Sequence, residues 1–189
     1  MSTLDLNATI RPATSDDASA LSVLGRRTFA DAFGKDNSPA DLTQFLDATY
    51  SPQIQRGELR DPLLSYLVVE RGSQLVGFAL LRSGKASPFV ADASALEVQR
   101  FYVDQSCHGT GIAQALMAAC VDHAMRSGAG TLFLGVWEKN PRALRFYARE
   151  GFVEVGRQVF QVGSDRQQDL VLARRLAAPP ATASFATPE

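Results

Sequence analysis

The stretch of sequence that decides the fold runs from Leu96 to Phe152 and reads LEVQRFYVDQSCHGTGIAQALMAACVDHAMRSGAGTLFLGVWEKNPRALRFYAREGF. Its first residues have the composition typical of a strand, and a loop with two glycines follows. The spacing of the apolar residues then becomes helical. The predicted elements are a strand over 96–103, a glycine loop over 105–113, a helix over 112–126, a buried strand over 131–136, and a helix from Asn140-Pro141 to Gly151-Phe152.

Helical periodicity precedes this stretch, and strand alternation lies on both sides of it. Helices are expected to begin after Thr14–Asp17, at Ser38-Pro39 and at Ser51-Pro52, because Ser, Thr and Asp cap helices and Pro fits the first turn. Further strands are expected over 8–11, 66–69, 75–81, 153–160 and 169–176. We therefore predict an α/β fold, a single domain over residues 8–176 with a mixed, mostly antiparallel sheet flanked by helices. Residues 177–189, which lack periodicity, are expected to form a disordered tail.

Composition describes an ordinary globular domain. The chain has 189 residues, of which 46% are hydrophobic and 21% charged, and this length suits one domain with a sizeable core. The formal net charge of -1 argues against a nucleic-acid partner, because such proteins normally carry a basic excess. No apolar stretch is long enough to span a membrane, and the first residues lack the pattern of a signal peptide. A cytoplasmic protein is expected.

The cysteines and histidines predict neither a disulfide nor a metal site. Cys107 and Cys120 are the two cysteines, and in a cytoplasmic protein we expect both to be reduced. The two histidines, His108 and His123, do not form a cluster with cysteines at the spacing of metal ligands.

The glycine loop is a candidate anion site. Gly109 and Gly111 lie at a strand-to-helix turn, where the absence of Cβ atoms lets backbone amides approach an anion and the helix N-terminus adds a favourable dipole. A dinucleotide fingerprint is excluded because Gln114 stands where its third glycine belongs, and no Gly-Lys-Ser/Thr of a Walker loop follows. The amides expected to hold a pyrophosphate are those of His108, Gly109, Thr110, Gly111, Ile112 and Ala113.

Asn140 and Tyr147 are the second constellation. They are seven residues apart, which is about two helical turns, so both can face one cleft with the small Ala143 between them. Asn140 would hydrogen-bond the amides of a cofactor arm. Tyr147 would donate a proton to a departing thiolate, because a phenol with a pKa near ~10 stays protonated at neutral pH. The alternative for each residue alone is a helix cap and a core aromatic.

The span 96–152 resembles the GNAT superfamily of N-acetyltransferases, with the signature Asn140-x-x-Ala143-x-x-Phe146-Tyr147-x-x-x-Gly151-Phe152. The resemblance implies that acetyl-CoA is the cosubstrate. It implies that the glycine loop binds the CoA pyrophosphate and that pantetheine adds to the splayed end of the preceding strand. A backbone amide near Phe101, Tyr102 and Val103 would then bond the acetyl oxygen. Ser106 departs from the family's usual Gln or Arg and leaves the backbone cradle intact.

A narrower similarity concerns the acceptor. The run Val136-Trp-Glu-Lys-Asn140, followed by Gly156, Phe160, Gly163 and Gln168-Asp169, is similar to the bacterial PaiA-type spermine/spermidine acetyltransferases. It implies a polyamine acceptor. No run of carboxylates marks a polyamine pocket, and the scattered candidates are Asp31, Asp36 and Glu70.

Transfer to an amine requires the neutral amine, because a Lys-like ammonium has a pKa near ~10.4. The superfamily resemblance implies a carboxylate base acting through water, and Glu97 on the strand over 96–103 is the candidate. In a regular strand Glu97 and Gln99 would share one face with Phe101 and Val103, and a bulge would break this alternation. An exposed structural role for Glu97 is the alternative.

The sequence therefore predicts an acetyl-CoA-dependent N-acetyltransferase that acts on a small amine by direct attack in a ternary complex. A protein N-terminal or lysine acetyltransferase with the same cofactor half is one alternative, and a non-catalytic acyl-CoA-binding module is another. The acceptor, the acyl chain and the oligomeric state stay open, with a homodimer as one option.

Overall fold

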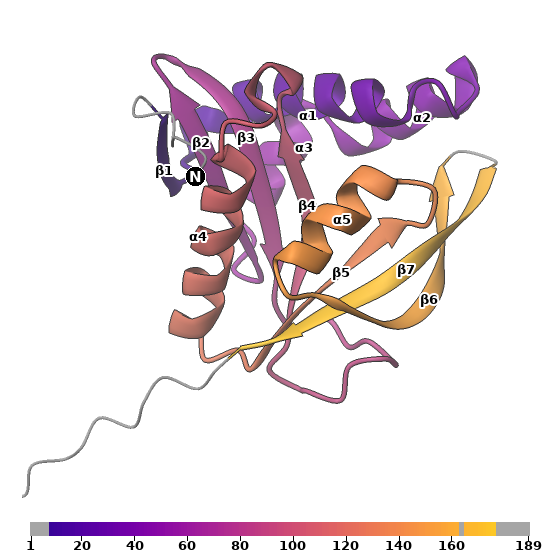
Figure 1. Ribbon diagram of the computed structural model, residues 1–189. Coiled ribbons are helices and arrows are strands. Elements are labelled where there is room, and N and C mark those ends of the chain that lie inside the picture. The colour runs from indigo at the N-terminus through magenta and orange to yellow at the C-terminus, as the bar shows by residue number, and fades with distance from the viewer. Residues whose placement is uncertain (1–7, 163–164, 177–189) are drawn as a thin grey trace, which may run out of the picture.

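The computed structural model describes residues 8–162 and 165–176, which form one seven-stranded sheet with helices on both faces (Figure 1). The strand order is β1-β2-β3-β4-β5-β7-β6. The strands are β1 Ala8–Pro12, β2 Leu64–Arg71, β3 Gln74–Arg82, β4 Leu96–Val103, β5 Thr131–Trp137, β6 Val153–Val162 and β7 Asp165–Arg175. The helices are α1 Ala18–Phe33, α2 Pro39–Thr49, α3 Pro52–Glu58, α4 Ile112–Arg126 and α5 Pro141–Arg149, with short 3-10 turns at Ser15–Asp17 and Gln105–Cys107.

Two hydrophobic cores lie on opposite faces of the sheet. On one face α4 and α5 pack over the sheet through a buried core that includes Leu116, Met117 and Tyr147. On the other face α1, α2 and α3 pack through a core that includes Leu24, Phe29 and Tyr50. Such burial of apolar side chains supplies most of the folding free energy. The predicted mixed α/β fold of one domain is confirmed.

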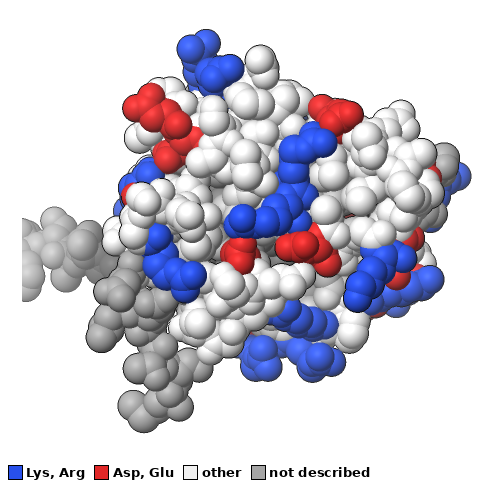
Figure 2. All heavy atoms as spheres, turned by 90° about the horizontal axis from the view of Figure 1, so that it is seen from above, with Lys and Arg blue, Asp and Glu red and all other residues white. Residues whose placement is uncertain are grey.

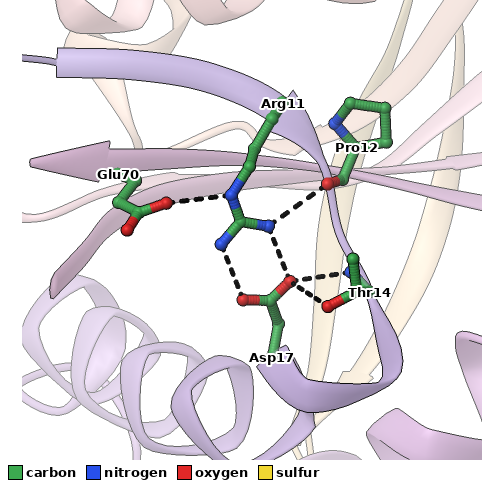
Figure 3. Close-up of polar contacts among 5 residues, drawn as sticks. All are labelled: Arg11, Pro12, Thr14, Asp17 and Glu70. Atoms are coloured by element: carbon green, nitrogen blue, oxygen red, sulfur yellow. Dashed lines mark hydrogen bonds and ion pairs between the residues drawn. The ribbon is translucent and has the colours of Figure 1, made fainter. Parts of the chain in front are cut away.

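Helix starts follow the capping chemistry of the sequence. Ser38, Ser51 and Asn140 each precede a proline, and each side chain accepts a hydrogen bond from the backbone N–H three residues later. At the start of the domain, Asp17 accepts hydrogen bonds from the Thr14 amide and from the guanidinium of Arg11 (Figure 3). These contacts fix where each helix leaves the sheet.

Arg11 also binds Glu70, with 2.9 Å between Nε and Oε2 (Figure 3). Because Thr9 on β1 lies opposite Glu70 on β2, this ion pair belongs to the β1 edge of the sheet. Glu70 was a candidate for recognition of a cationic acceptor. The structure places it in this edge contact instead.

The pairing of β4 with β5 is short and parallel, whereas all other described strand neighbours are antiparallel. It consists of Leu96 opposite Leu132 and Glu97 opposite Phe133. Beyond these positions β4 continues to Val103 and β5 to Trp137 without further pairing. The backbone of each strand on this side is therefore free to pair with a ligand in the opening between them.

A bulge interrupts β4 directly after Val98. On β3, Leu80 lies opposite Arg100 and Leu81 lies opposite Val98, so Gln99 has no partner. The regular alternation of the strand is lost. Phe101 and Val103 pack against the α4–α5 core that also holds Leu96 and Val98, whereas Tyr102 packs against the α1–α3 core. Glu97 consequently does not share the face of Phe101 and Val103.

The other predicted boundaries of helices and strands lie close to those of the structure, with one clear exception. Residues 163–166 were expected to separate the last two strands, but β7 begins at Asp165 rather than at Asp169. Its buried positions Gln167 and Asp169 are polar and so lack the apolar alternation typical of a strand. Residues 177–189, expected to form a tail, lie outside the described residues. Within residues 8–162 and 165–176, no helix combines the length and the apolar character needed to cross a membrane.

Candidate active site

A cavity of about 720 Å³ opens where β4 and β5 diverge. It runs from the glycine loop and the start of α5 to a pocket under α1, so it joins the two halves of the predicted site. At the first end its lining includes Gly109, Gly111, Ala113, Asn140 and Tyr147. At the other end its lining includes Phe33, Glu97, Trp137, Phe160 and Asp169.

The glycine loop presents unbonded amides at the start of α4. Gly109 and Gly111 have φ of 80° and 83°, a left-handed conformation that favours glycine. The amides of His108 and Thr110 bond back to Gln105 and Cys107. No described acceptor receives a hydrogen bond from the amides of Gly109, Gly111, Ile112, Ala113 or Gln114. These are the groups that fit a pyrophosphate, at the positive end of the α4 dipole.

Two residues of the loop have internal roles. The imidazole Nε2 of His108 lies 3.0 Å from the carbonyl oxygen of Val103 and donates to it. Thr110 Oγ1 donates to the carbonyl oxygen of Cys107 over 2.7 Å. The first bond ties the loop to the end of β4, and the second ties it to the 3-10 turn Gln105–Cys107. The Ile112 side chain is buried in the core beneath. Only the backbone of Ile112 can therefore serve a ligand.

Asn140 caps α5 and also lines the cavity. Its Oδ1 accepts a hydrogen bond from the amide of Ala143 over 3.0 Å. Its amide NH2 group donates to no described residue, so two donors remain for a ligand in the cavity. The capping alternative and the binding role thus use different atoms of one side chain.

Tyr147 lies on α5 beside β4, with its ring 6.3 Å from that of Phe101 and 5.7 Å from that of Phe152. The side chain is buried, and its hydroxyl forms no hydrogen bond with any described residue. Burial raises the pKa of Tyr147 above its ordinary value. The phenol therefore keeps its proton at neutral pH and has it available for a group in the cavity.

Glu97 is buried on the face of the sheet opposite to α5 and Tyr147, and it forms an ion pair with Lys85. Lys85 Nζ lies 2.6 Å from Glu97 Oε1, while Oε2 is buried without a partner among the described residues. Lys85 comes from the loop between β3 and β4, and both residues line the cavity. The alternative of an exposed structural glutamate does not apply, since the residue is 5% exposed.

Sequence reasoning missed the polar residues that β7 and β6 contribute to the cavity. Gln167 and Asp169 on β7 are buried, and Gln158 on β6 lies opposite Asp169. Gln167 Nε2 donates to Asn37 Oδ1 over 3.0 Å and so ties β7 to the α1–α2 connection. Of the scattered carboxylate candidates, Asp31 and Asp36 do line the cavity. These residues come together only through the fold.

Aromatic rings form the remaining wall of the cavity at the end under α1. The ring of Phe33 on α1 lies 6.0 Å from that of Trp137 on β5. Phe160 on β6 lines the cavity and its ring lies 5.9 Å from that of Phe45 on α2. Elsewhere the face shown in Figure 2 carries basic and acidic side chains side by side without an extended patch of one sign.

Cys107 and Cys120 are free and buried, which agrees with two reduced cysteines. Burial raises the pKa of Cys120 to about 12, so this thiol is unreactive. In the part of the chain that the structure describes, no three His, Cys, Asp or Glu side chains gather as metal ligands.

The unbonded amides at the start of α4 and the open side of β4 and β5 line one cavity that could hold an extended anionic ligand. The family model of the acetyltransferase (GNAT) family matches residues 28–152. The chain belongs to this family and is an N-acetyltransferase.

Curated relatives carry the same family name. The chain is 33% identical over 153 residues to an uncharacterized N-acetyltransferase of Lactobacillus delbrueckii subsp. lactis, covering 81% of this chain and 88% of the relative. It is 34% identical over 160 residues to one of Mycobacterium bovis, covering 85% and 98%.

Solved structures share the fold. The PaiA N-acetyltransferase of Thermoplasma acidophilum, in complex with coenzyme A, has a TM-score of 0.73 at 17% identity, over 90% of this chain and 99% of that one. YncA of Salmonella typhimurium, with its cofactor acetyl-CoA, has a TM-score of 0.69 at 20% identity, over 97% and 98%.

Proposed function

We propose that the protein transfers the acetyl group of acetyl-CoA to a primary amine of a small molecule, with a polyamine as the first candidate. The observation that carries this proposal is the single cavity that joins unbonded amides at the start of α4 to a carboxylate-lined pocket under α1. Transfer is direct, in a ternary complex, because the thioester is already activated and needs no enzyme nucleophile.

The binding of acetyl-CoA is inferred from hydrogen-bonding groups that have no partner among the described residues. The amides of Gly109, Gly111, Ile112 and Ala113 hold the pyrophosphate, and the Asn140 NH2 group bonds pantetheine. The unpaired edge of β4 around Phe101 to Val103 bonds the arm and polarises the acetyl carbonyl. Tyr147 then gives its proton to the departing sulfur. The CoA and acetyl-CoA complexes of PaiA and YncA, which share this fold, support the choice of cosubstrate.

The acceptor half favours a small cationic molecule over a peptide. Its carboxylates Asp31, Asp36 and Asp169 attract an ammonium, and the rings of Phe33, Trp137 and Phe160 suit the apolar stem of an alkylamine. The Gln167–Asn37 hydrogen bond and the Phe45–Phe160 contact join β6 and β7 to α1 and α2 at this end. A peptide acceptor would need an open groove there.

An acceptor screen tests the function. The protein is given acetyl-CoA with spermidine, spermine, putrescine and other small amines in one series, and with peptides bearing a free N-terminus or lysine in another. Free CoA thiol is measured, and the products are weighed by mass spectrometry. Acetylated polyamine without acetylated peptide supports the proposal. Acetylated peptide alone would favour the protein acetyltransferase, and binding without thiol release would favour the non-catalytic module.

Acetyl-CoA should protect the protein against heat without any metal. A ligand that binds only the folded state stabilises it by RT ln(1 + [L]/Kd), about 2.7 kcal/mol at a hundredfold excess over Kd. We expect the thermal midpoint, measured by differential scanning fluorimetry with EDTA present, to rise by several degrees at millimolar acetyl-CoA. An unchanged midpoint would contradict the cofactor site.

Two substitutions at Asn140 should separate its two roles. Asn140→Asp keeps an oxygen that can accept from the Ala143 amide but removes the NH2 donors, so stability should hold while the Kd for acetyl-CoA rises about tenfold. Asn140→Ala should weaken binding equally and also cost about 1 kcal/mol of unfolding free energy, because the cap is lost.

Calorimetric titration and urea unfolding measure the two quantities. Ser51→Ala, which removes the matching cap of α3 away from the cavity, is the control for stability alone. Equal acetyl-CoA affinity in wild type and Asn140→Asp would show that Asn140 is only a cap.

A further inference from the structure

Two buried carboxylates, Glu97 and Asp169, point into the acceptor half of the cavity from neighbouring parts of the sheet. Glu97 lies opposite Phe133 on β5, and Asp169 lies opposite Trp137 on the same strand. Between these positions β5 carries Gly135. A Cβ there would lie 2.7 Å from Gln158 Nε2 and 3.0 Å from Asp169 Oδ2, so these two side chains occupy the space that a larger residue would fill.

The two carboxylates differ in their partners. Glu97 forms an ion pair with Lys85, whose Nζ lies 2.6 Å from Oε1. Asp169 is 7% exposed and forms no hydrogen bond or ion pair with any described residue. A buried carboxylate without a partner is costly for a fold to keep. Its presence in a cavity therefore points to a ligand cation.

We infer that Asp169, not Glu97, receives the ammonium of the acceptor and takes its proton; this inference rests on the proposed function. As the acceptor nitrogen forms its bond to the acetyl carbon, the carbon–sulfur bond breaks. Before this attack Asp169 takes one proton of the ammonium, directly or through one water, so that the neutral nitrogen has a lone pair. The sulfur then takes the Tyr147 proton, and the second proton of the nitrogen passes through water to the Tyr147 oxygen. Asp169 ends the reaction protonated and releases its proton to solvent. Glu97 stays paired with Lys85 and shapes the wall of the cavity.

The electrostatic surroundings agree with this assignment. Burial raises the pKa of the Asp169 carboxyl to about 6, which makes it a stronger base than an ordinary aspartate while it stays ionised at neutral pH. Its strand neighbours Gly135, Trp137 and Gln158 are uncharged. The other titratable or charged side chains that line the cavity are Asp31, Asp36, Lys85, Glu97, Arg100, Tyr102, Cys107, His108, Lys139, Arg142, Tyr147 and Arg149.

The test compares the pH profile of kcat/KM for wild type, Asp169→Asn, Glu97→Gln and the exposed control Asp47→Asn, using the best amine of the acceptor screen. Wild type, Glu97→Gln and Asp47→Asn should lose activity as pH falls through about 6. Asp169→Asn should be lower by ~10²-fold at pH 8, should lack this acidic limb, and should bind acetyl-CoA as wild type does.

Stability gives a second measurement that shows the variant is folded. A carboxyl whose pKa is raised by folding destabilises the folded state as pH rises from the unfolded value of about 4 through about 6. Asp169→Asn removes this cost, so its thermal midpoint should exceed that of wild type at pH 8, and the difference should vanish near pH 4.

The outcomes are distinct. Asp169→Asn with the activity and acidic limb of wild type, or Glu97→Gln without that limb, overturns the role of Asp169 and leaves the acetyltransferase proposal standing. A folded Asp169→Asn variant with raised KM but unchanged kcat overturns the proton transfer. A wild-type protein that binds acetyl-CoA but acetylates no amine overturns the proposed function and this role with it.

Discussion

Tyr147→Phe should lower kcat by ~10²- to 10³-fold while the Kd for acetyl-CoA stays near that of wild type. General acid catalysis supplies about this factor, and the substitution removes only the hydroxyl. The ring remains against Phe101, Phe146 and Phe152, so packing is preserved. Because the hydroxyl has no partner among the described residues, the unfolding free energy should change little.

Single-turnover kinetics measure the chemical step, and calorimetric titration measures the Kd. Tyr50→Phe is the matched control, because it also removes a buried phenolic hydroxyl, but from a residue that does not line the cavity. Its kcat should stay within a few-fold of wild type. If Tyr147→Phe turns over at the wild-type rate while chemistry limits that rate, Tyr147 is not the acid.

The cofactor half was accessible to sequence reasoning because its elements are continuous in the chain. The glycine loop, α4, β5 and α5 follow one another within residues 96–152, and each begins with a recognisable signal. Gly109 and Gly111 have the left-handed conformation that their position implied. Asn140-Pro141 starts α5 as expected. Such local features can be predicted from the sequence because residues that are neighbours in the chain determine them.

The residues proposed to bind the acceptor could not be recognised in the sequence, because the buried positions of their strand are polar. Strand prediction looks for alternating apolar residues, but the inward positions at the start of β7 are Gln167 and Asp169. Residues 163–166 were therefore interpreted as separating the last two strands, and the start of the strand was placed four residues late. Asp169 reaches the cavity only through pairing with β5 and β6, which no local pattern encodes.

The face of the sheet on which Glu97 lies shows a second limit of prediction from the sequence. Side-chain alternation assumes regular pairing, and the extra residue Gln99 reverses the parity of everything beyond it. The bulge arises from a contact between β3 and β4 that the sequence of β4 alone does not specify. Because of this one unpaired residue, Glu97 lies on the face of the sheet opposite to the side chains of Phe101 and Val103, which pack against the α4–α5 core.

The bulge is held in place by a partly buried polar cluster of Arg100, Glu58 and Tyr66. Loss of Arg100 from this cluster should be strongly destabilising. Arg100, the residue after Gln99, lies with Nη2 2.9 Å from Glu58 Oε1 on α3. Arg100 Nη1 donates to Glu58 Oε2 over 2.9 Å and to the Tyr66 hydroxyl over 3.0 Å. The Tyr66 hydroxyl itself donates to Glu58 over 2.5 Å. These bonds connect β4 to α3 and β2 under the cavity.

Arg100→Met should lower the unfolding free energy by about 3–5 kcal/mol, because it leaves the Glu58 charge buried without a counter-charge. For a chain of this length the thermal midpoint should fall by roughly 10 °C or more. The acetyl-CoA affinity should fall as well, since β4 loses the anchor beside its bulge. Urea unfolding, scanning calorimetry and calorimetric titration measure these effects.

Two variants decide whether burial is the cause. Arg157→Met breaks the exposed pairs with Glu154 and Glu138 and should cost no more than about 1 kcal/mol. Replacing both Arg100 and Glu58 by Met should recover much of the loss, because an apolar pair of similar volume carries no desolvation penalty. If Arg100→Met is no worse than Arg157→Met, the cluster does not hold the bulge. If the double variant recovers stability but not acetyl-CoA affinity, the cluster positions β4 for the cofactor.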